Sequence, residues 1–202
     1  MLKKIFILLL LCVASNVYAD ECVQYKMVPT AKVKTPKYTT SVIQPINPMD
    51  KYHGNVVATL IQDFDLVVDI IAANGGYCVA IKKVDSEIGY NDFEIKIDRS
   101  NIRGSCAYNA ILNHEKKHIN AYLSVIDDLE SDIETSVFNA ANSVMPIFVN
   151  RREDLDNAIE KMNIEIQSHP DIILIKQKIN AAVEIRNKRI DQNETNEELN
   201  KC

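Results

Sequence analysis

Two histidines flank a glutamate in the segment His114-Glu115-Lys116-Lys117-His118. On an α-helix, residues four positions apart lie one above the other, so both imidazole rings can reach a single metal ion. Zinc accepts nitrogen ligands, and a catalytic zinc site keeps one position open for water. Glu115 lies beside the first histidine, where its carboxylate can take a proton from that water and pass it to a leaving amine. The pattern therefore predicts a zinc site with Glu115 as the general base.

Two other interpretations of the motif are weaker. His114 and His118 could be core residues beside a surface glutamate. However, the chain holds only four histidines, which makes this spacing a roughly one-in-a-hundred coincidence. Glu115 and His118 also satisfy the E-x-x-H rule of di-iron helical bundles, which need a second such pair. The nearest match, Glu165 with His169, has one residue too many.

The motif lies in the most strongly helical segment of the chain. Ser105 is typical of an N-terminal helix cap, and no glycine or proline follows it as far as Met145. Apolar residues recur along one face and polar residues along the other. The pattern predicts one long amphipathic helix, or two with a subtle joint, which Pro146 ends. Just upstream, Phe93 to Asp98 alternates apolar and polar residues, which predicts a half-buried strand.

Upstream of these elements, periodicity and turn residues indicate further structure. Four prolines from Asp20 to His53 favour short strands and loops over a long helix. Apolar residues at helical spacing predict a helix from Asn55 to Asn74, ended by Gly75-Gly76. A strand is expected from Tyr77 to Val84, followed by a connection over residues 85–92.

Downstream, Asn150 is expected to cap a helix that reaches about Gln167, and Ser168 with Pro170 opens a last helix. The expected fold class is α+β. A small antiparallel or mixed sheet packs on a backing helix and on the long motif helix, and the C-terminal part is helical.

The first residues indicate export. Lys3 and Lys4 precede an apolar run, and Val17-Tyr18-Ala19 places small residues where a signal peptidase cleaves. The run is too short for a transmembrane helix, and no later segment is long enough. We expect a signal peptide over residues 1–19 and a mature chain that is periplasmic or secreted, without a transmembrane segment. Cleavage after Ala19 is favoured over lipidation of Cys12, because Leu11 is not small.

The mature chain, residues 20–202, has the length of a single domain. The sheet and motif helix are expected in residues 20–145 and the helical part in residues 146–202. The formal net charge of the full chain is −5, and no basic stripe marks a nucleic-acid surface, so nucleic acid is excluded as a partner.

Removal of the signal peptide leaves four cysteines, Cys22, Cys78, Cys106 and Cys202. An even count in an exported chain favours disulfides, with three pairings open. A strand packed against the motif helix would bring Cys78 to Cys106, so we predict a Cys78–Cys106 bond. Cys22 and Cys202, near the two ends of the mature chain, are the expected second pair.

The motif and its setting resemble the zincin metallopeptidases over residues 55–132. The resemblance implies that His114 and His118 bind zinc and that Glu115 is the general base. It also casts Phe93 to Asp98 as the edge strand that lines the cleft and pairs with an extended substrate. The metzincin subclass is excluded, because its downstream glycine and histidine are replaced by Ala121 and Ser124.

The third zinc ligand depends on packing and stays open at this point. Glu130 and Glu134 follow the motif closely, but a straight helix would carry them away from the metal. The segment after Pro146 could return alongside the motif and supply a ligand. One further histidine precedes the motif. The candidates are His169, Glu134, Glu160, Glu130, Glu153, Asp171 and His53.

The expected function is that of an exported zinc metallopeptidase or related amide hydrolase, acting on a peptide, protein or cell-wall substrate. Tyr108 and Tyr122 are candidates for stabilising the developing oxyanion. The alternative is a non-catalytic zincin-like protein that binds an envelope partner, with zinc structural or absent. Retention of Glu115 favours the enzyme, because a structural metal needs no general base.

Overall fold

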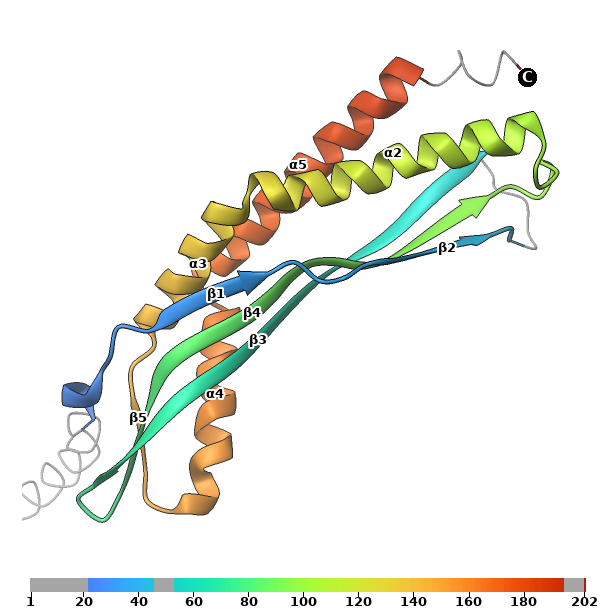
Figure 1. The fold of residues 1–202 in the computed structure, drawn as a ribbon. Helices are drawn as coiled ribbons and strands as arrows, with labels where there is room; N and C mark the ends of the chain where they lie inside the picture. Colours follow the sequence, from blue (N-terminus) through green and yellow to red (C-terminus); the bar gives the residue numbers. More distant parts are fainter. Residues whose placement is uncertain (1–21, 46–52, 195–201) are drawn as a thin grey trace, which may run out of the picture. The chain divides into compact units, whose positions relative to one another are not determined.

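The computed structural model describes residues 22–45, 53–194 and 202, and the expected signal peptide lies outside them. Strands and helices within these ranges are shown in Figure 1. In chain order they are a 3-10 turn Val23–Tyr25, β1 Thr30–Lys34, β2 Thr39–Ile43, β3 Gly54–Ala73, β4 Gly76–Ile97, α2 Cys106–Asp128, α3 Glu130–Ser143, β5 Ile147–Val149, a 3-10 turn Arg152–Asp154, α4 Leu155–Gln167 and α5 Pro170–Glu194. None of the described helices is long and apolar enough to cross a membrane.

The sheet is mixed and is built around β4, which pairs with each of the other four strands. β2 runs parallel to the end of β4, with Thr39 opposite Asp92. β5 runs antiparallel to its beginning, with Tyr77 opposite Val149. The expected α+β class with a mixed sheet and a helical C-terminal part is confirmed.

The backing helix expected from Asn55 to Asn74 is wrong, because this segment is the strand β3. Its apolar residues fit helical spacing, but its side chains alternate between more and less exposed along Gly54 to Leu60. Asn74 and Gly75 form the turn of a hairpin with β4, not a helix end. Gly75 has a φ of 85°, a left-handed conformation that glycine adopts without steric cost. Asn-Gly between two strands is a strong hairpin signal.

The predicted break at residues 85–92 is also absent, because β4 is one continuous strand. Gly89 lies inside the strand with a φ of 152°, a conformation that residues with a side chain rarely adopt. An added Cβ would lie 2.8 Å from Cδ of Pro36, so glycine also leaves room for this proline. The strand expected from Phe93 to Asp98 is therefore the end of β4. Its role as a substrate-binding edge is wrong, because β2 pairs with one side of it and β3 with the other. The Asp98 N–H donates to the His53 carbonyl oxygen over 2.9 Å at the same end.

The helices follow the sequence patterns more closely. The Ser105 hydroxyl accepts a hydrogen bond from the Tyr108 N–H over 3.2 Å, which confirms the predicted cap. The predicted joint lies at Leu129, between α2 and α3. The helix after Pro146 ends at Gln167 as expected. Its expected cap, Asn150, is wrong, because a 3-10 turn intervenes and α4 begins at Leu155.

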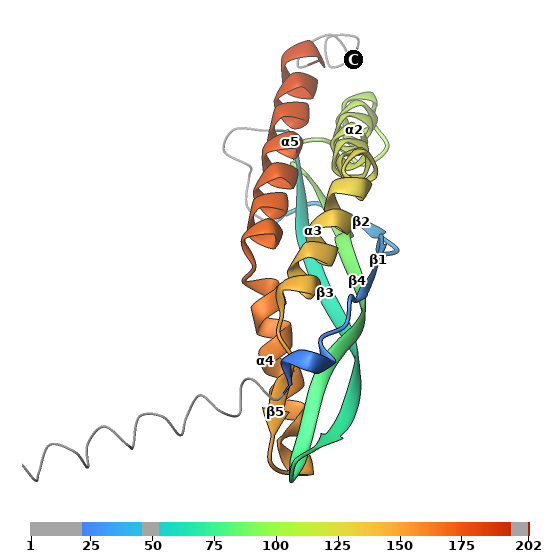
Figure 2. The same cartoon turned by 90° about the vertical axis from the view of Figure 1, so that its left-hand side faces the viewer.

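The chain divides into two compact units, each built from three segments. Of the described residues, the first unit comprises those within 22–32, 64–85 and 135–173, and the second comprises those within 33–63, 86–134 and 174–202. In the first unit, α4 contacts β5 (Figure 2). Both units contain parts of β3, β4 and α5, and the expectation of a single domain stays a prediction.

In the second unit, α2 and the C-terminal part of α5 lie on one side of the sheet (Figures 1 and 2). The core of this unit includes side chains of β4 and α2 that are almost fully buried: Ile88, Phe93, Ile95, Ile97, Val125 and Ile126. Burial of these apolar faces fixes which side of α2 points toward the sheet.

The disulfides join Cys22 to Cys78 and Cys106 to Cys202, so both predicted pairings are wrong. Each bond lies within one unit. Cys78 is near the beginning of β4, whereas Cys106 follows the end of that strand. Cys78 therefore belongs to the first unit and Cys106 to the second. The prediction failed because it placed two short strands where one long strand exists.

Candidate metal centre

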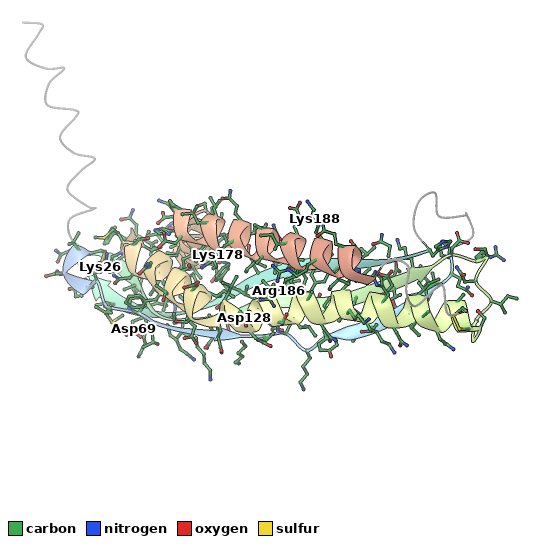
Figure 3. The ribbon with its side chains drawn as sticks, turned by 90° about the horizontal axis from the view of Figure 1, so that it is seen from above. Lys26, Asp69, Asp128, Lys178, Arg186 and Lys188 are labelled. Carbon is green, nitrogen blue, oxygen red and sulfur yellow. A yellow bond between two sulfur atoms is a disulfide. The ribbon has the colours of Figure 1, made fainter. Side chains whose placement is uncertain are left out.

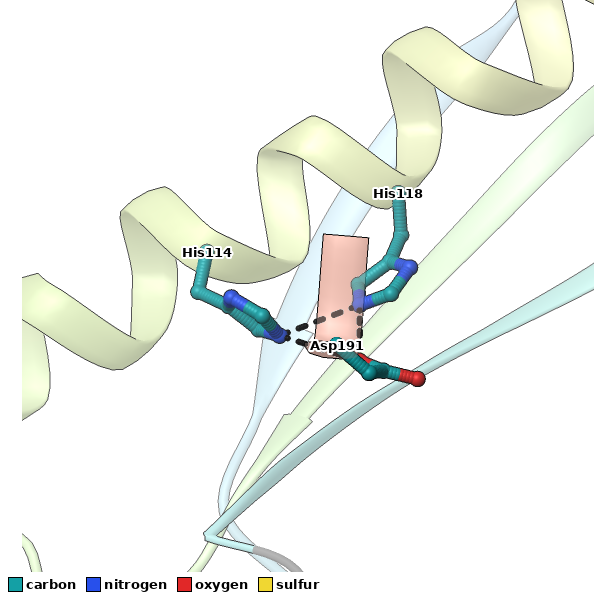
Figure 4. Close-up of side chains that lie close together, drawn as sticks. All are labelled: His114, His118 and Asp191. Atoms are coloured by element: carbon teal, nitrogen blue, oxygen red, sulfur yellow. Dashed lines mark hydrogen bonds and ion pairs between the residues drawn. The ribbon is translucent and has the colours of Figure 1, made fainter. Parts of the chain in front are cut away.

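Helices α2 and α5 bring three side chains with metal-binding atoms together. His114 and His118 project from successive turns of α2, as the four-residue spacing predicts. Asp191 lies near the end of α5, and Figure 4 shows its carboxylate between the two imidazole rings. Among the residues that the structure describes, His114, His118 and Asp191 form a group that could hold a metal ion. All three belong to the second unit.

The three donor atoms form a nearly regular triangle. The two Nε2 atoms lie 3.1 Å apart. Oδ1 of Asp191 lies 3.4 Å from Nε2 of His114 and 3.2 Å from Nε2 of His118. In a tetrahedral zinc site with bonds of about 2.0–2.1 Å, neighbouring ligand atoms lie about 3.3 to 3.4 Å apart. The triangle thus has the size of one face of such a tetrahedron, and the donor set fits a small divalent ion.

The other ring nitrogen of His118 is held by α5. Its Nδ1 lies 3.0 Å from Oδ1 of Asn187, one turn before Asp191. When Nδ1 donates its hydrogen to this amide oxygen, the lone pair of the neutral ring is left on Nε2, toward the other donors. Such outer contacts orient a histidine ligand and set its tautomer. One turn of α5 therefore supplies both Asp191, a candidate metal ligand, and Asn187, which orients the candidate ligand His118.

Glu115 is buried between α2 and the start of β3, with 4% of its surface exposed. A Cβ at Gly54 would lie 2.4 Å from Oε1 of Glu115 and 2.5 Å from Cγ2 of Ile111. The carboxyl group thus fills space that the missing side chain of Gly54 leaves. Burial, and to a lesser degree the negative charge of Asp191, raises the pKa of Glu115 to about 7. A carboxyl group with a pKa near neutrality can both take up and release a proton at neutral pH.

Polar contacts tie α5 to α2 and α3 within the second unit. The guanidinium of Arg186 donates to the Ser124 hydroxyl over 2.5 Å and also to the Asp128 carboxylate. Lys178 and Asp132 form an ion pair of 2.5 Å. Figure 3 shows Arg186 and Asp128 between the two helices. Exposed ion pairs contribute little stability singly; these contacts join α5 to α2 and α3 in the register that has Asp191 beside the histidines.

The third member of the group, Asp191, is not among the seven residues predicted for that position. Glu153, Glu160, His169 and Asp171 belong to the first unit, whereas the metal-binding group belongs to the second. The Asp171 carboxylate instead accepts a hydrogen bond from Asn139 over 2.9 Å.

Glu130, Glu134 and His53 lie in the second unit but are exposed and are not part of the group. Asn187 and Asp191 are one turn apart on the last helix, but this spacing alone does not mark a metal ligand. Its relation to the motif depends on the packing of α5 against α2.

A pocket of about 520 Å³ borders this centre. Asp191 and Asn187 line it, as do Tyr90 of β4 and Tyr122 of α2. The Tyr90 and Tyr122 rings meet edge to face, with centroids 4.8 Å apart. Of the two tyrosines considered for the oxyanion, only Tyr122 lines the pocket, whereas Tyr108 is buried with 5% of its surface exposed.

Comparisons with protein-family models, with curated proteins and with solved structures found no match to this chain. Function is therefore inferred from the residues of the centre and their geometry.

Proposed function

We propose that this protein is an exported, zinc-dependent hydrolase of amide bonds, with His114, His118 and Asp191 as the zinc ligands. The observation that carries the proposal is the triangle of donor atoms, 3.1 to 3.4 Å apart. The buried carboxyl group of Glu115 is near enough to this triangle for the charge of Asp191 to raise its pKa. Three protein ligands leave one position of a tetrahedral zinc free, which is the arrangement of catalytic sites. The zincin-like character suggested by the motif is part of the same proposal.

Bound zinc would supply Lewis acidity, polarising a substrate carbonyl and making water acidic enough to attack it at neutral pH. Glu115 accepts the proton of the attacking water and then donates it to the leaving amine. Asn187 holds the ring of His118 in place, and Asp191 contributes the negative charge that two neutral imidazoles lack. The Tyr122 phenol, which lines the same pocket as Asp191, can donate a hydrogen bond to the substrate carbonyl oxygen as negative charge develops.

Two observations support access to the centre and the setting in which it works. The Asp191 side chain is 55% exposed and that of His114 is 21% exposed, so the donor triangle is open to solvent on the side of Asp191. The two disulfides are consistent with an oxidising location outside the cytoplasm. A periplasmic or secreted protein is therefore part of the proposal.

Glu115→Gln tests the proposal against the non-catalytic alternative. The amide keeps the shape of the carboxyl group but cannot accept the proton, so zinc content should stay at about one ion per chain. Cleavage of a quenched fluorescent peptide mixture by the zinc-loaded protein should fall by roughly 100-fold or more. Turnover at the unsubstituted rate would show that Glu115 is not the base. Zinc binding without cleavage in the unsubstituted protein would favour the binding protein with structural zinc.

A further inference from the structure

The pocket beside the candidate metal centre has two walls, both in the second unit. One contains Ala58 and Leu60 of β3, with Tyr90 of β4 and Tyr122 of α2. The other is a face of α5 that begins at Asn180 and ends at Asp191. We call this space the tyrosine pocket.

The tyrosine pocket adjoins the donor triangle at Asp191. Asp191 lines the pocket and also lies 3.2 Å from Nε2 of His118. Tyr122 follows His118 by one turn of α2, on the same side of the helix. From Asn180 to Asp191 the α5 wall is about 16 Å long. That length accommodates roughly five residues of an extended chain.

The lining of the pocket has little net charge when Asp191 binds the metal ion. Glu184 and Lys188 are four residues apart on α5, so their opposite charges offset one another. Asn180 offers an amide donor and an amide acceptor, which match the two polar groups of a peptide unit, whereas Asn187, whose oxygen holds His118, offers its amide N–H donors. Tyr90 is only 3% exposed, whereas Tyr122 is half-buried, so Tyr122 offers the more accessible aromatic surface.

On the basis of the proposed hydrolase function, we propose that the tyrosine pocket binds an uncharged, extended segment of a peptide substrate. The ring of Tyr122 contacts an apolar or aromatic side chain close to the cleaved bond. The Asn180 amide binds a backbone group further from the metal. A strongly charged segment is disfavoured, because the pocket holds no unbalanced charge to pair with it.

Cleavage of a mixture of short peptides that samples all residues at each position tests this assignment. With zinc-loaded protein, mass spectrometry should locate cleavage between uncharged residues, with an apolar or aromatic residue at one fixed position. Ala58→Phe fills the pocket and should lower kcat/KM at these sites by at least about tenfold, equivalent to 1.4 kcal/mol. Zinc content should not change. Val57→Phe is the matched control, because Val57 is exposed and absent from the pocket lining.

A second variant guards against misfolding of Ala58→Phe. Asn180→Ala removes an amide from an exposed helix position without adding volume, and should raise KM while kcat is unchanged. Cleavage that neither Ala58→Phe nor Asn180→Ala affects would overturn the assignment of the pocket. A requirement for a charged residue at the fixed position would overturn it as well.

Binding without turnover separates this proposal from the hydrolase itself. The same peptides are passed over immobilised, zinc-loaded Glu115→Gln protein. Retention of the uncharged, apolar class without cleavage by the unsubstituted protein would refute hydrolysis but support the pocket. Peptides that are neither cleaved nor retained would overturn the pocket proposal. Acetate release from an N-acetylated chito-oligosaccharide, lost in Ala58→Phe, would assign the pocket to a glycan and overturn the peptide assignment.

Discussion

At the scale of single residues, the candidate centre combines a local motif with two side chains of the last helix. His114, Glu115 and His118 are set by the spacing of the motif on α2. Asp191 and Asn187 come from α5 and contact the histidines directly. The motif could be recognised from the sequence because its geometry depends on one helix alone. Asp191 could not be recognised as a metal ligand from the sequence, since no short-range pattern relates it to α2.

Asp191→Asn tests the third ligand. The amide is almost the same size but lacks the negative charge, so zinc affinity should fall by more than the roughly 10- to 100-fold loss typical of an outer contact. Asp127→Asn is the matched control, because Asp127 is an exposed carboxylate on α2 outside the donor group. Competition with a zinc chelator measures both affinities. Equal affinities for the two variants would show that Asp191 is not a ligand.

Glu115 should also give the metal-free protein a distinct pH dependence. Its pKa is raised from 4.5 to about 7, so between these values the folded protein binds more protons than the unfolded chain. The free energy of unfolding should therefore fall as pH rises through this window. Glu115→Gln lacks the titrating group. As pH rises from 4.5 to 7.5, the free energy of unfolding of this variant should therefore increase relative to that of the unsubstituted protein, by at most about 3 kcal/mol. Denaturant titrations in a chelator at pH 4.5 and 7.5 measure the difference, and a constant difference would refute the expectation.

At the scale of elements, the helices were easier to predict than the strands. Ser105 and the uninterrupted segment after it identified α2 and α3, because caps and missing helix breakers are local signals. β3 resembles a helix in its sequence, because its apolar residues also satisfy helical spacing: Val57, Leu60, Ile61, Phe64 and Val68. The Asn74-Gly75 turn and the many β-branched residues nearby favour a hairpin. Once β3 was misassigned, the length of β4 and the cysteine pairing were also predicted wrongly.

The Cys106–Cys202 bond should support the metal centre through its elements. Cys106 begins α2, which carries both histidines, and Cys202 follows α5, which carries Asp191. Loss of the bond frees the end of the chain relative to α2, so Cys106→Ser with Cys202→Ser should lower zinc affinity. Cys22→Ser with Cys78→Ser is the matched control, because that bond lies in the first unit. Chelator competition under the same conditions should show a smaller effect of the control pair. An equal or larger effect would contradict this role.

At the scale of the whole molecule, composition and motif together indicated the α+β class, the helical C-terminal part and export with disulfides. The mixed sheet and two disulfides agree with that class and with an oxidising location. The sequence shows no boundary between the two compact units, because β3 and β4 each contribute to both. The ligand from α5 and the tyrosine pocket both depend on long-range packing, which periodicity does not encode.

Zinc binding by the purified protein tests the central claim most directly. Titration of metal-free protein with zinc, followed calorimetrically, should give about one ion per chain. The double variant His114→Ala, His118→Ala should lose tight binding, because Asp191 alone cannot hold zinc against buffer. Intact disulfides and an unchanged circular dichroism spectrum would show that this variant is folded. Stoichiometric, tight zinc binding by the folded double variant would contradict the metal centre proposed for His114, His118 and Asp191.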